Sequence, residues 1–111
     1  MNKKKGIPRT ALERVISQFR GKVETALNSS VQVILYGSYA REEETWDSDV
    51  DLLVIVPKLD KSALDKILEA AWEVGFEAGV VLSVIPVAQE ELKTLAASPF
   101  LQAVQSEGIP L

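Results

Sequence analysis

The chain carries Gly37-Ser38-Tyr39-Ala40-Arg41 and, a few residues later, Asp47-Ser48-Asp49-Val50-Asp51-Leu52-Leu53-Val54. A Gly-Ser turn thus ends one apolar run, and two aspartates at alternate positions open the next. Alternate side chains of a β-strand share a face, roughly 7 Å apart. Two carboxylates at that spacing can bind one or two Mg²⁺ ions, and a Gly-Ser turn can offer backbone N–H groups to phosphates. The pattern predicts metal-dependent chemistry on a nucleoside triphosphate.

Size and charge narrow the class of protein. With 111 residues, of which 47% are hydrophobic, the chain is expected to form one domain over residues 1–111, with residues 1–8 flexible. The basic run of Lys3, Lys4 and Lys5 is expected to be a solvated tail. The formal net charge of −4 disfavours nucleic acid as a partner, because surfaces that bind nucleic acid are usually basic.

Missing residue types exclude several chemistries. The absence of Cys and His excludes disulfides, thiolate nucleophiles, histidine triads and imidazole zinc sites. Carboxylates, hydroxyls, Lys, Arg and a bound metal are left, and oxygen ligands favour Mg²⁺ or Mn²⁺. No apolar run reaches the roughly 18 residues of a membrane span, and no signal-peptide pattern opens the chain. We therefore expect a cytoplasmic protein with no membrane partner.

The first half of the chain predicts one helix and two strands. Thr10-Ala11-Leu12-Glu13 reads as a capping box, and the amphipathic helix that follows is expected to end near Asn28. Residues 31–36 form a buried strand, and residues 39–41 are expected to begin a short helix. Residues 49–56 form the second strand. One face of that strand is wholly apolar and must lie on the core, so the aspartates are expected to point to the opposite side.

The second half predicts a helix that starts with a capping signal at Ser62 and ends at Gly75. A strand over residues 80–87 follows, with Pro86 at its end or at a sheet edge, and then a helix over residues 88–97. The apolar residues expected to face the core are Leu64, Ile67, Leu68, Ala71 and Trp72 in the first of these helices and Leu92 and Leu95 in the second.

A last helix is expected to start at Ser98, with Pro99 at its first position, and to stop at Gly108. The order of elements is helix, strand, strand, helix, strand, helix, helix. This order predicts an α/β or α+β fold in which helices cover a small mixed sheet.

At this point the chain resembles a known family. Gly37-Ser38, a spacer of about ten residues and Asp49-Val50-Asp51 on a strand are similar to the signature of the DNA polymerase beta-like nucleotidyltransferases. The fuller string Gly-Ser-Tyr-Ala-Arg…Asp-Ser-Asp-Val-Asp-Leu-Leu-Val resembles the minimal nucleotidyltransferases, the small stand-alone members. The tail Ser98-Pro99-Phe100-Leu101…Glu107-Gly108-Ile109 resembles members that are paired with a HEPN-domain protein. Because turn, spacer and strand context agree, the alternative of a plain tight turn beside a solvated acidic face is disfavoured.

The resemblance implies a role for each residue of the motif. Gly37 would let the backbone approach the triphosphate, and the Ser38 hydroxyl would hold its phosphates. Asp49 and Asp51 would be the catalytic residues and would coordinate Mg²⁺ or Mn²⁺, which orients the α-phosphate. Arg41 would contact phosphate or a partner.

Two departures from the family pattern stand out. Active members usually carry a third carboxylate on the strand next to the aspartates, and the matching strand here offers Ser83 at the position of that third carboxylate. Glu77 precedes the strand and is a weaker substitute. The second departure is Glu42, where the family commonly has Gly. With Glu43 and Glu44 it forms an acidic loop that is either solvated, a surface for a basic partner, or a cause of weak nucleotide affinity.

Three further residues near the motif have structural interpretations that we favour. Asp47 is expected to support the loop rather than to bind metal. Trp46 and Tyr39 could stack on a base, but aromatic residues beside a turn more often pack against the protein.

Together these observations predict a nucleotidyltransferase that moves a nucleoside monophosphate, AMP from ATP in the family precedent, to a hydroxyl of a protein partner. The resemblance implies that the chain is the antitoxin of a HEPN-type toxin. The alternative is a binding module of the same fold that neutralises its partner by occlusion. A transferase acting on an aminoglycoside or nucleic acid is a third, weaker interpretation. Homo-oligomer formation is left open.

Overall fold

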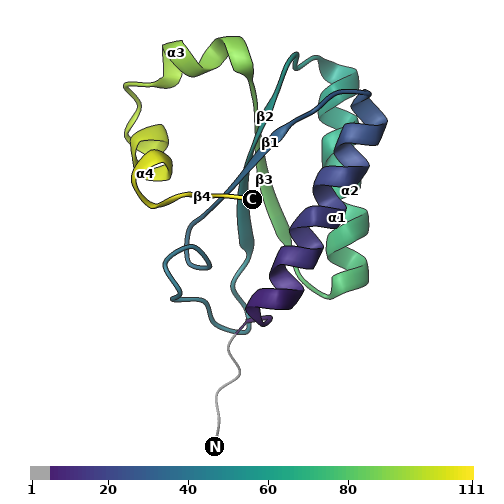
Figure 1. Ribbon diagram of the computed structural model, residues 1–111, viewed down its shortest axis with the longest axis vertical. Helices are drawn as coiled ribbons and strands as arrows, with labels where there is room; N and C mark the ends of the chain where they lie inside the picture. Colours follow the sequence, from purple (N-terminus) through teal and green to yellow (C-terminus); the bar gives the residue numbers. More distant parts are fainter. Residues whose placement is uncertain (1–5) are drawn as a thin grey trace, which may run out of the picture.

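A four-stranded mixed sheet forms the centre of the computed structural model, which describes residues 6–111 (Figure 1). The strands are β1 (Gln32–Tyr36), β2 (Val50–Val56), β3 (Leu82–Ala88) and β4 (Ile109–Pro110), in the order β3-β2-β1-β4. β1 is antiparallel to β2 and β4, whereas β2 and β3 are parallel. The expected α+β fold with a small mixed sheet is therefore confirmed. The lysine run at residues 3–5 lies outside the described residues.

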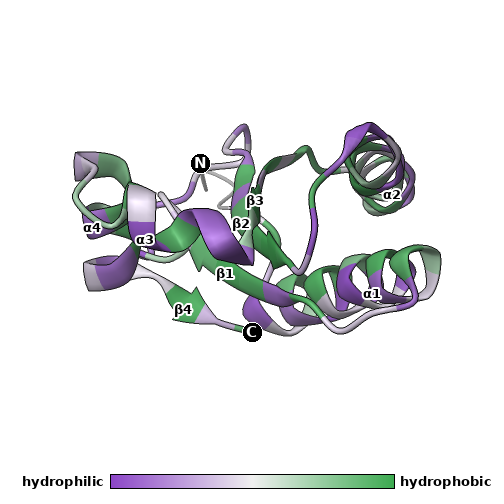
Figure 2. Ribbon diagram, turned by 90° about the horizontal axis from the view of Figure 1, so that it is seen from above, coloured by the Kyte–Doolittle hydropathy of each residue, from purple (hydrophilic) through white to green (hydrophobic). Residues whose placement is uncertain are grey.

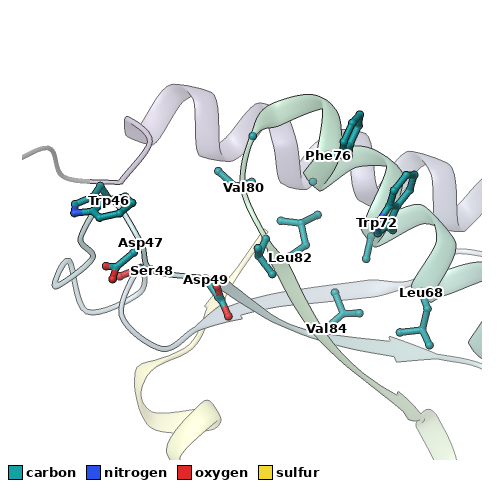
Figure 3. Close-up of a pocket in the computed structure, with 14 residues that line it drawn as sticks. Trp46, Asp47, Ser48, Asp49, Leu68, Trp72, Phe76, Val80, Leu82 and Val84 are labelled. Carbon is teal, nitrogen blue, oxygen red and sulfur yellow. The ribbon is translucent and has the colours of Figure 1, made fainter.

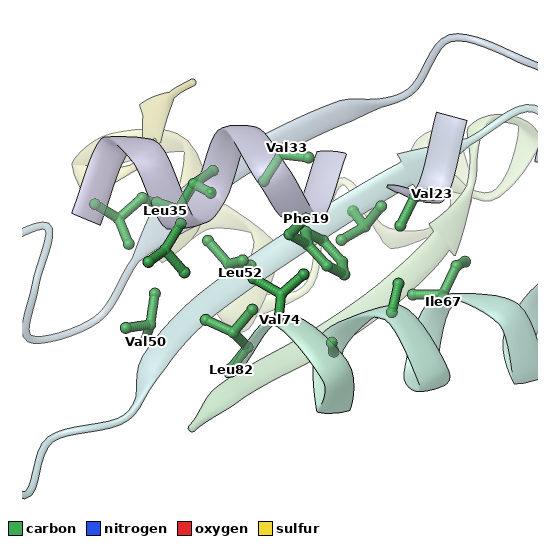
Figure 4. Packing of buried hydrophobic residues seen from close by; sticks show 14 of the residues in the cluster. Phe19, Val23, Val33, Leu35, Val50, Leu52, Ile67, Val74 and Leu82 are labelled. Atoms are coloured by element: carbon green, nitrogen blue, oxygen red, sulfur yellow. The ribbon is translucent and has the colours of Figure 1, made fainter. Parts of the chain in front are cut away.

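Two long helices, α1 (Arg9–Leu27) and α2 (Lys61–Ala78), lie side by side on one face of the sheet (Figure 2). Between them and the strands lies the main hydrophobic core, with Phe19 at its centre and no exposed surface on that ring (Figure 4). The apolar face of β2 belongs to this core, as expected. Its residues are Val50, Leu52, Val54 and Val56, all fully buried.

The start of α1 differs from the sequence prediction, and its end agrees with it. α1 starts at Arg9 after Pro8, which caps without a side-chain hydrogen bond, so the capping box at Thr10 is wrong; Arg9 pairs with Glu13 instead. Its end is as expected, because Asn28 adopts the left-handed conformation and its N–H donates to the carbonyl of Glu24. No helix of the described residues is long and apolar enough to cross a membrane.

The boundaries of α2 also correct the sequence prediction. Asp60, not Ser62, is the N-cap, and its carboxylate accepts the N–H of Ala63 at 2.8 Å. The helix continues through Gly75 to a C-cap at Gly79. Gly75 is a packing residue rather than a cap, because a Cβ there would come within 2.7 Å of the carbonyl oxygen of Val80.

The opposite face of the sheet is partly covered by the segment that follows β3 (Figure 2). The helix expected over residues 88–97 is instead a 3₁₀ turn, η1 (Gln89–Glu91), followed by a single helical turn, α3 (Leu92–Leu95), and Leu95 is exposed. α4 (Pro99–Glu107) is capped by Ser98, whose hydroxyl accepts the N–H of Leu101, and stops at Gly108, as expected. β4 then joins the edge beside β1 and was missing from the sequence prediction.

α4 covers only part of this second face. A small second core joins it to the C-terminal half of β2 and consists of Leu53, Ile55, Val87, Leu101 and Val104. The N-terminal half of β2 is left uncovered on that face, and it carries Asp51, with Asp49 directly before the strand.

Candidate active site

Three side chains form a row across the uncovered end of the sheet. Asp51 on β2 is the register partner of Tyr36 on β1 and of Ser83 on β3. Residues paired across neighbouring strands share a face and lie about 4.8 Å apart in the sheet direction. Ser83 is thus the direct neighbour of Asp51, the juxtaposition that the alternation of the third strand predicted. Strand β2 begins at Val50, so Asp49 precedes the strand rather than opening it, which corrects the predicted boundary by one residue.

Asp51 is held in a setting that disfavours its charge. Burial, followed by repulsion from Asp49, raises the pKa of Asp51 above its ordinary value of 3.8, while the positive charge of Arg41 lowers it. Burial and the charge of Asp51 together raise the pKa of Tyr36, so the phenol stays protonated. None of the ion pairs among residues 6–111 involves Asp49 or Asp51. Two carboxylates that form no ion pair can be neutralised by a bound cation.

Gly37 begins the turn that faces this carboxylate. Its φ of 77° is in the left-handed region, and a Cβ at this position would collide with Oδ2 of Asp51. Only glycine fits here, both for the backbone conformation and for the space next to the carboxylate. The glycine therefore lets the Asp51 carboxylate pack directly against the turn.

The turn after Gly37 is a tight, helix-like coil rather than the short helix expected over residues 39–41. The N–H of Arg41 donates to the carbonyl of Gly37 at 3.1 Å, and the N–H of Glu43 donates to the carbonyl of Ser38 at 2.9 Å. In such a turn the first N–H groups have no partner within the turn and can bind an anion. Tyr39 is buried and its hydroxyl accepts the N–H of Ile7, so the packing interpretation is confirmed for Tyr39.

Arg41 is engaged with two glutamates. Its Nε donates to Glu43 at 2.9 Å and its Nη1 to Glu107, near the end of α4, at 3.0 Å. The hydrogen bond to Glu43 is the main cause that raises the pKa of Arg41. A phosphate would have to share or replace these partners, so phosphate binding by Arg41 stays a prediction.

Glu42 explains one departure from the family pattern. Its φ of 57° is left-handed, a conformation that glycine adopts without cost. From the sequence, the negative charge of Glu42 was one possible cause of weak nucleotide affinity. The structure adds a cost of backbone conformation, because the turn holds Glu42 in the left-handed region, which residues other than glycine adopt at a cost.

The loop before β2 holds Asp47 and Trp46 in different roles. Asp47 accepts a hydrogen bond from the hydroxyl of Thr45, whose N–H donates to Ser48 at 2.8 Å, so the loop-supporting role predicted for Asp47 is confirmed. Trp46 is 73% exposed, so the packing interpretation of Trp46 is wrong. Burial of aromatic residues depends on tertiary neighbours, which the local sequence does not reveal.

The donor set at the row suits a hard cation that binds substrate at the same time. Among residues 6–111, no three acidic side chains gather closely enough to form a metal site by themselves. Glu77 lies exposed on α2 and supplies no third carboxylate. Two carboxylates beside an open glycine turn nevertheless fit Mg²⁺, which commonly takes one or two protein carboxylates and completes its octahedron with phosphate oxygens and water.

Sequence reasoning missed Tyr36. It is the last residue of β1, directly before the Gly-Ser turn, and its ring packs edge-on against Phe100 of α4 with centroids 5.3 Å apart. The antiparallel pairing of β1 and β2 places it beside Asp51, and this pairing is a tertiary contact for which the local sequence carries no signal. Tyr36 joins the uncovered row to the helix that covers the rest of this face.

The match to known proteins agrees with this geometry. Residues 16–104 match the nucleotidyltransferase domain family, and the chain belongs to that family. Similar curated proteins of Methanocaldococcus jannaschii carry the name "Putative protein adenylyltransferase". One of them is 30% identical and is matched over 97% of this chain and 96% of the relative's length. Another is 29% identical and is matched over 86% of this chain and 93% of the relative's length. A third is 30% identical over 81% of this chain, which spans 64% of that relative's length.

Solved structures with the same fold include a mutant of the toxin–antitoxin complex MntA–HpeT. The TM-score is 0.54 at 20% identity, covering 96% of this chain and 72% of the other. A toxin–antitoxin structure with AMP-PNP gives a TM-score of 0.52 at 18% identity, covering 94% of this chain and 72% of the other. The family assignment makes the chain a nucleotidyltransferase, and these neighbours share its fold.

Proposed function

We propose that this protein transfers AMP from ATP to a hydroxyl of a partner protein in a Mg²⁺-dependent reaction. The observation that carries the proposal is the contact between Gly37 and Asp51: a turn that only glycine fits lies directly against a carboxylate that forms no ion pair. Phosphate and metal need to meet at one point for this chemistry, and the contact brings the phosphate turn and a metal-binding carboxylate together.

Each residue of the row would have a separate task. Ser38 and the first N–H groups of the turn bind the β- and γ-phosphates, and Asp49 and Asp51 hold Mg²⁺. When bound, the metal neutralises charge on the phosphates and on the leaving pyrophosphate. The hydroxyl of Tyr36, kept protonated, is a hydrogen-bond donor beside Asp51. The acceptor oxygen bonds to the α-phosphorus as the bond to pyrophosphate breaks. Ser83 offers no carboxylate for the hydroxyl proton, so water receives it and turnover is expected to be slow.

The acceptor is proposed to be a HEPN-domain toxin, with this chain as the antitoxin. The names of the curated relatives support a protein acceptor and an adenylyl group, and the fold neighbours are parts of toxin–antitoxin complexes. A tail that resembles HEPN-paired members supports the same assignment.

Two observations favour a second candidate function, a module that neutralises its partner by occlusion alone. The described residues lack a third carboxylate at the site, and Arg41 is already paired with Glu43 and Glu107. Under this alternative the fold and the partner are the same, but no covalent bond forms.

The test is incubation of the protein with ATP labelled in the α-phosphate, Mg²⁺ and a HEPN-domain protein from the same genome. We expect Mg²⁺-dependent label on the HEPN protein, loss of that label with Asp51→Asn, and no loss with Asp65→Asn, an exposed aspartate on α2 that pairs with Lys61. If Asp51→Asn still neutralises the toxin fully and no label appears with either protein, occlusion is the function.

A further inference from the structure

Exposed apolar side chains gather around one edge of the sheet, the free side of β3. Six of the large exposed hydrophobic residues belong to this surface: Trp46, Leu68, Trp72, Phe76, Val81 and Ile85. The corresponding helix stripe was expected to be buried, but Trp72 is 67% exposed and Leu68 is also on the surface, which corrects that prediction. Trp72 and Phe76 stack on each other with ring centroids 5.2 Å apart and planes 11° from parallel. Two stacked aromatic rings left in water form a surface suited to a partner.

All of these residues except Ile85 line a groove of about 710 Å³ that ends at Asp49 of the candidate active site (Figure 3). We call it the β3-edge groove. Trp46 stands on the loop before β2, whereas Trp72 and Phe76 stand on α2, and Asp49 lies between the loop and the strands. The surface also continues around the strand. Val81 and Ile85 alternate with Ser83, so they share the face that carries Asp51. Apolar surface thus leads from α2, around β3, to both sides of Ser83.

The backbone of β3 can accept another strand along this surface. β3 is the end strand of the sheet order. The carbonyl of Val81 accepts the N–H of Val50 at 2.9 Å, so odd-numbered residues of this segment turn their polar groups toward β2. Leu82 and Val84 therefore turn theirs outward, and Pro86, of the same parity, has no N–H to offer. Strand addition is possible at the half of the edge next to Ser83 and is blocked beyond it.

The in-line geometry of phosphoryl transfer indicates which molecule occupies the β3-edge groove. The attacking and leaving oxygens lie on opposite sides of the phosphorus in such a displacement. The phosphate turn follows β1, the carboxylate Asp51 is on β2, and β3 is on the far side of β2. With pyrophosphate held at Gly37, the acceptor oxygen must come from the β3 side. A second copy of this chain fits less well, because an antiparallel pair centred on Val84 would set Leu82 against Pro86.

We infer that the β3-edge groove docks an extended, hydroxyl-bearing segment of the acceptor protein. The segment pairs with the outward groups of Leu82 and Val84 and places apolar side chains on Trp72 and Phe76, so that its hydroxyl arrives at Ser83 beside Asp51. This inference rests on the proposed transfer function for the nature of its occupant. It goes further in naming the surface, the backbone pairing and the alternating apolar character of the segment.

The test uses a blocked eight-residue peptide with a central tyrosine and valine or isoleucine at alternate positions. Both tryptophans of the chain line the groove, so their fluorescence reports its occupancy directly. We expect a saturable blue shift, together with amide shifts at Leu82 and Val84 in NMR spectra. Phe76→Lys, at a residue that is 73% exposed, is expected to weaken peptide binding at least tenfold. Leu95→Lys, at an exposed apolar residue on α3, is the matched control and is expected to leave affinity within twofold.

Peptides N-methylated at alternate amides test the strand pairing. One of the two methylation registers should abolish binding and the other should not, because a strand edge uses every second amide. The inference is overturned by equal binding in both registers, by no saturable change up to about 1 mM peptide, or by a dimer of this chain that Phe76→Lys converts to a monomer. It is also overturned if ATP alone fills the groove and displaces the peptide.

Transfer of labelled AMP to the HEPN protein separates the two proposals. Transfer that requires Asp51 but is insensitive to Phe76→Lys leaves the proposed function intact and overturns the docking groove. Peptide binding that requires Phe76, without transfer to any acceptor, supports the groove and contradicts the proposed reaction.

Discussion

The two ends of strand β2 have opposite surroundings although they belong to one continuous strand. The C-terminal half is covered on both faces, by α1 and α2 on one side and by Leu101 and Val104 of α4 on the other. The N-terminal half is covered on one face alone, and the free face carries Asp51 between Tyr36 and Ser83. The covered half contributes stability and the uncovered half contributes chemistry. A helix that stops short of the strand end therefore defines the site.

The covered half is expected to give the largest effect. Leu53 is 1% exposed in the second core, and Leu53→Ala should lower the free energy of unfolding by about 2–5 kcal/mol through lost burial and a cavity. Urea unfolding measures this change. Ile85→Ala, two residues along the sheet edge from Ser83 and partly exposed, is the control and should cost far less. An equal loss of stability at both positions would show that α4 does not bury the C-terminal half of β2.

The uncovered half is expected to gain activity from a restored carboxylate. Ser83→Asp places an acid next to Asp51, where it can complete the metal site and take the proton of the acceptor. Such a group contributes roughly 10²–10⁴-fold to rate, so we expect a rise in AMP transfer of about 100-fold or more. Single-turnover assays with labelled ATP measure it. Ser83→Asn, similar in size but uncharged, should give no gain; a gain with Asn would attribute the effect to packing instead.

Alanine variants of two glycines with the same backbone conformation distinguish the cost of backbone strain from a loss of phosphate binding. Gly37 has φ 77° and faces Asp51, whereas Gly79 has φ 74° and no atom near its missing Cβ. Alanine at either position should cost about 1–2 kcal/mol of stability from the left-handed conformation. Gly37→Ala alone should weaken nucleotide binding at least tenfold, about 1.4 kcal/mol. Calorimetry with a non-hydrolysable ATP analogue checks this, and equal nucleotide affinity in both variants would place the phosphates elsewhere.

A variant of Glu42 is expected to give a smaller effect than the glycine variants and one of opposite sign. Glu42→Gly removes a left-handed side-chain conformation, so we expect a gain in stability of up to about 1 kcal/mol. It also removes a negative charge near the phosphate turn, so nucleotide affinity should rise. Asn28→Gly is the matched variant at φ 52°, at the end of α1 and away from the turn. It should leave nucleotide affinity unchanged; a rise with both variants would mean that the charge of Glu42 is irrelevant.

The pH dependence of Asp51 is expected to give the smallest effect. Because the folded state raises its pKa above 3.8, the folded protein holds this proton more tightly than the unfolded chain does. The cost of ionising Asp51 is absent below the ordinary pKa, grows as pH rises between the ordinary and the raised pKa, and is complete above it. Without metal, Asp51→Asn should therefore stabilise the protein at pH 7, by less than about 1 kcal/mol for a partly solvated charge. Thermal unfolding from pH 3 to pH 7 measures the gain.

The matched control for this measurement is Asp65→Asn on the exposed face of α2, where no such pH-dependent gain is expected. Mg²⁺ should reverse the order at pH 7, because only the carboxylate binds the metal. A gain from Asp51→Asn that persists at pH 3 would contradict electrostatic strain as its cause.

Most errors of the sequence prediction lie at element ends and on exposed surfaces. Thr10 and Ser62 are good capping residues, yet the helices start at Arg9 and Lys61 because backbone geometry and Asp60 decide the caps. Trp72 follows the helical period of a buried stripe but is exposed, since no element of the described chain lies beyond β3 to cover it. Periodicity states which residues share a face, not whether a neighbour covers that face.

By itself the sequence determined the mixed fold, the strand that carries Asp51, and the direct neighbourhood of Ser83, because alternation in a strand is a local geometric property. The roles of Asp49, Asp51, Gly37, Ser38 and Arg41 stay predictions. Only the tertiary structure decided that Tyr36 completes the row, that Gly37 leaves room for the Asp51 carboxylate, and that β3 ends the sheet. These facts depend on strand order and on how far α4 reaches, and both are set by packing between segments distant in the chain.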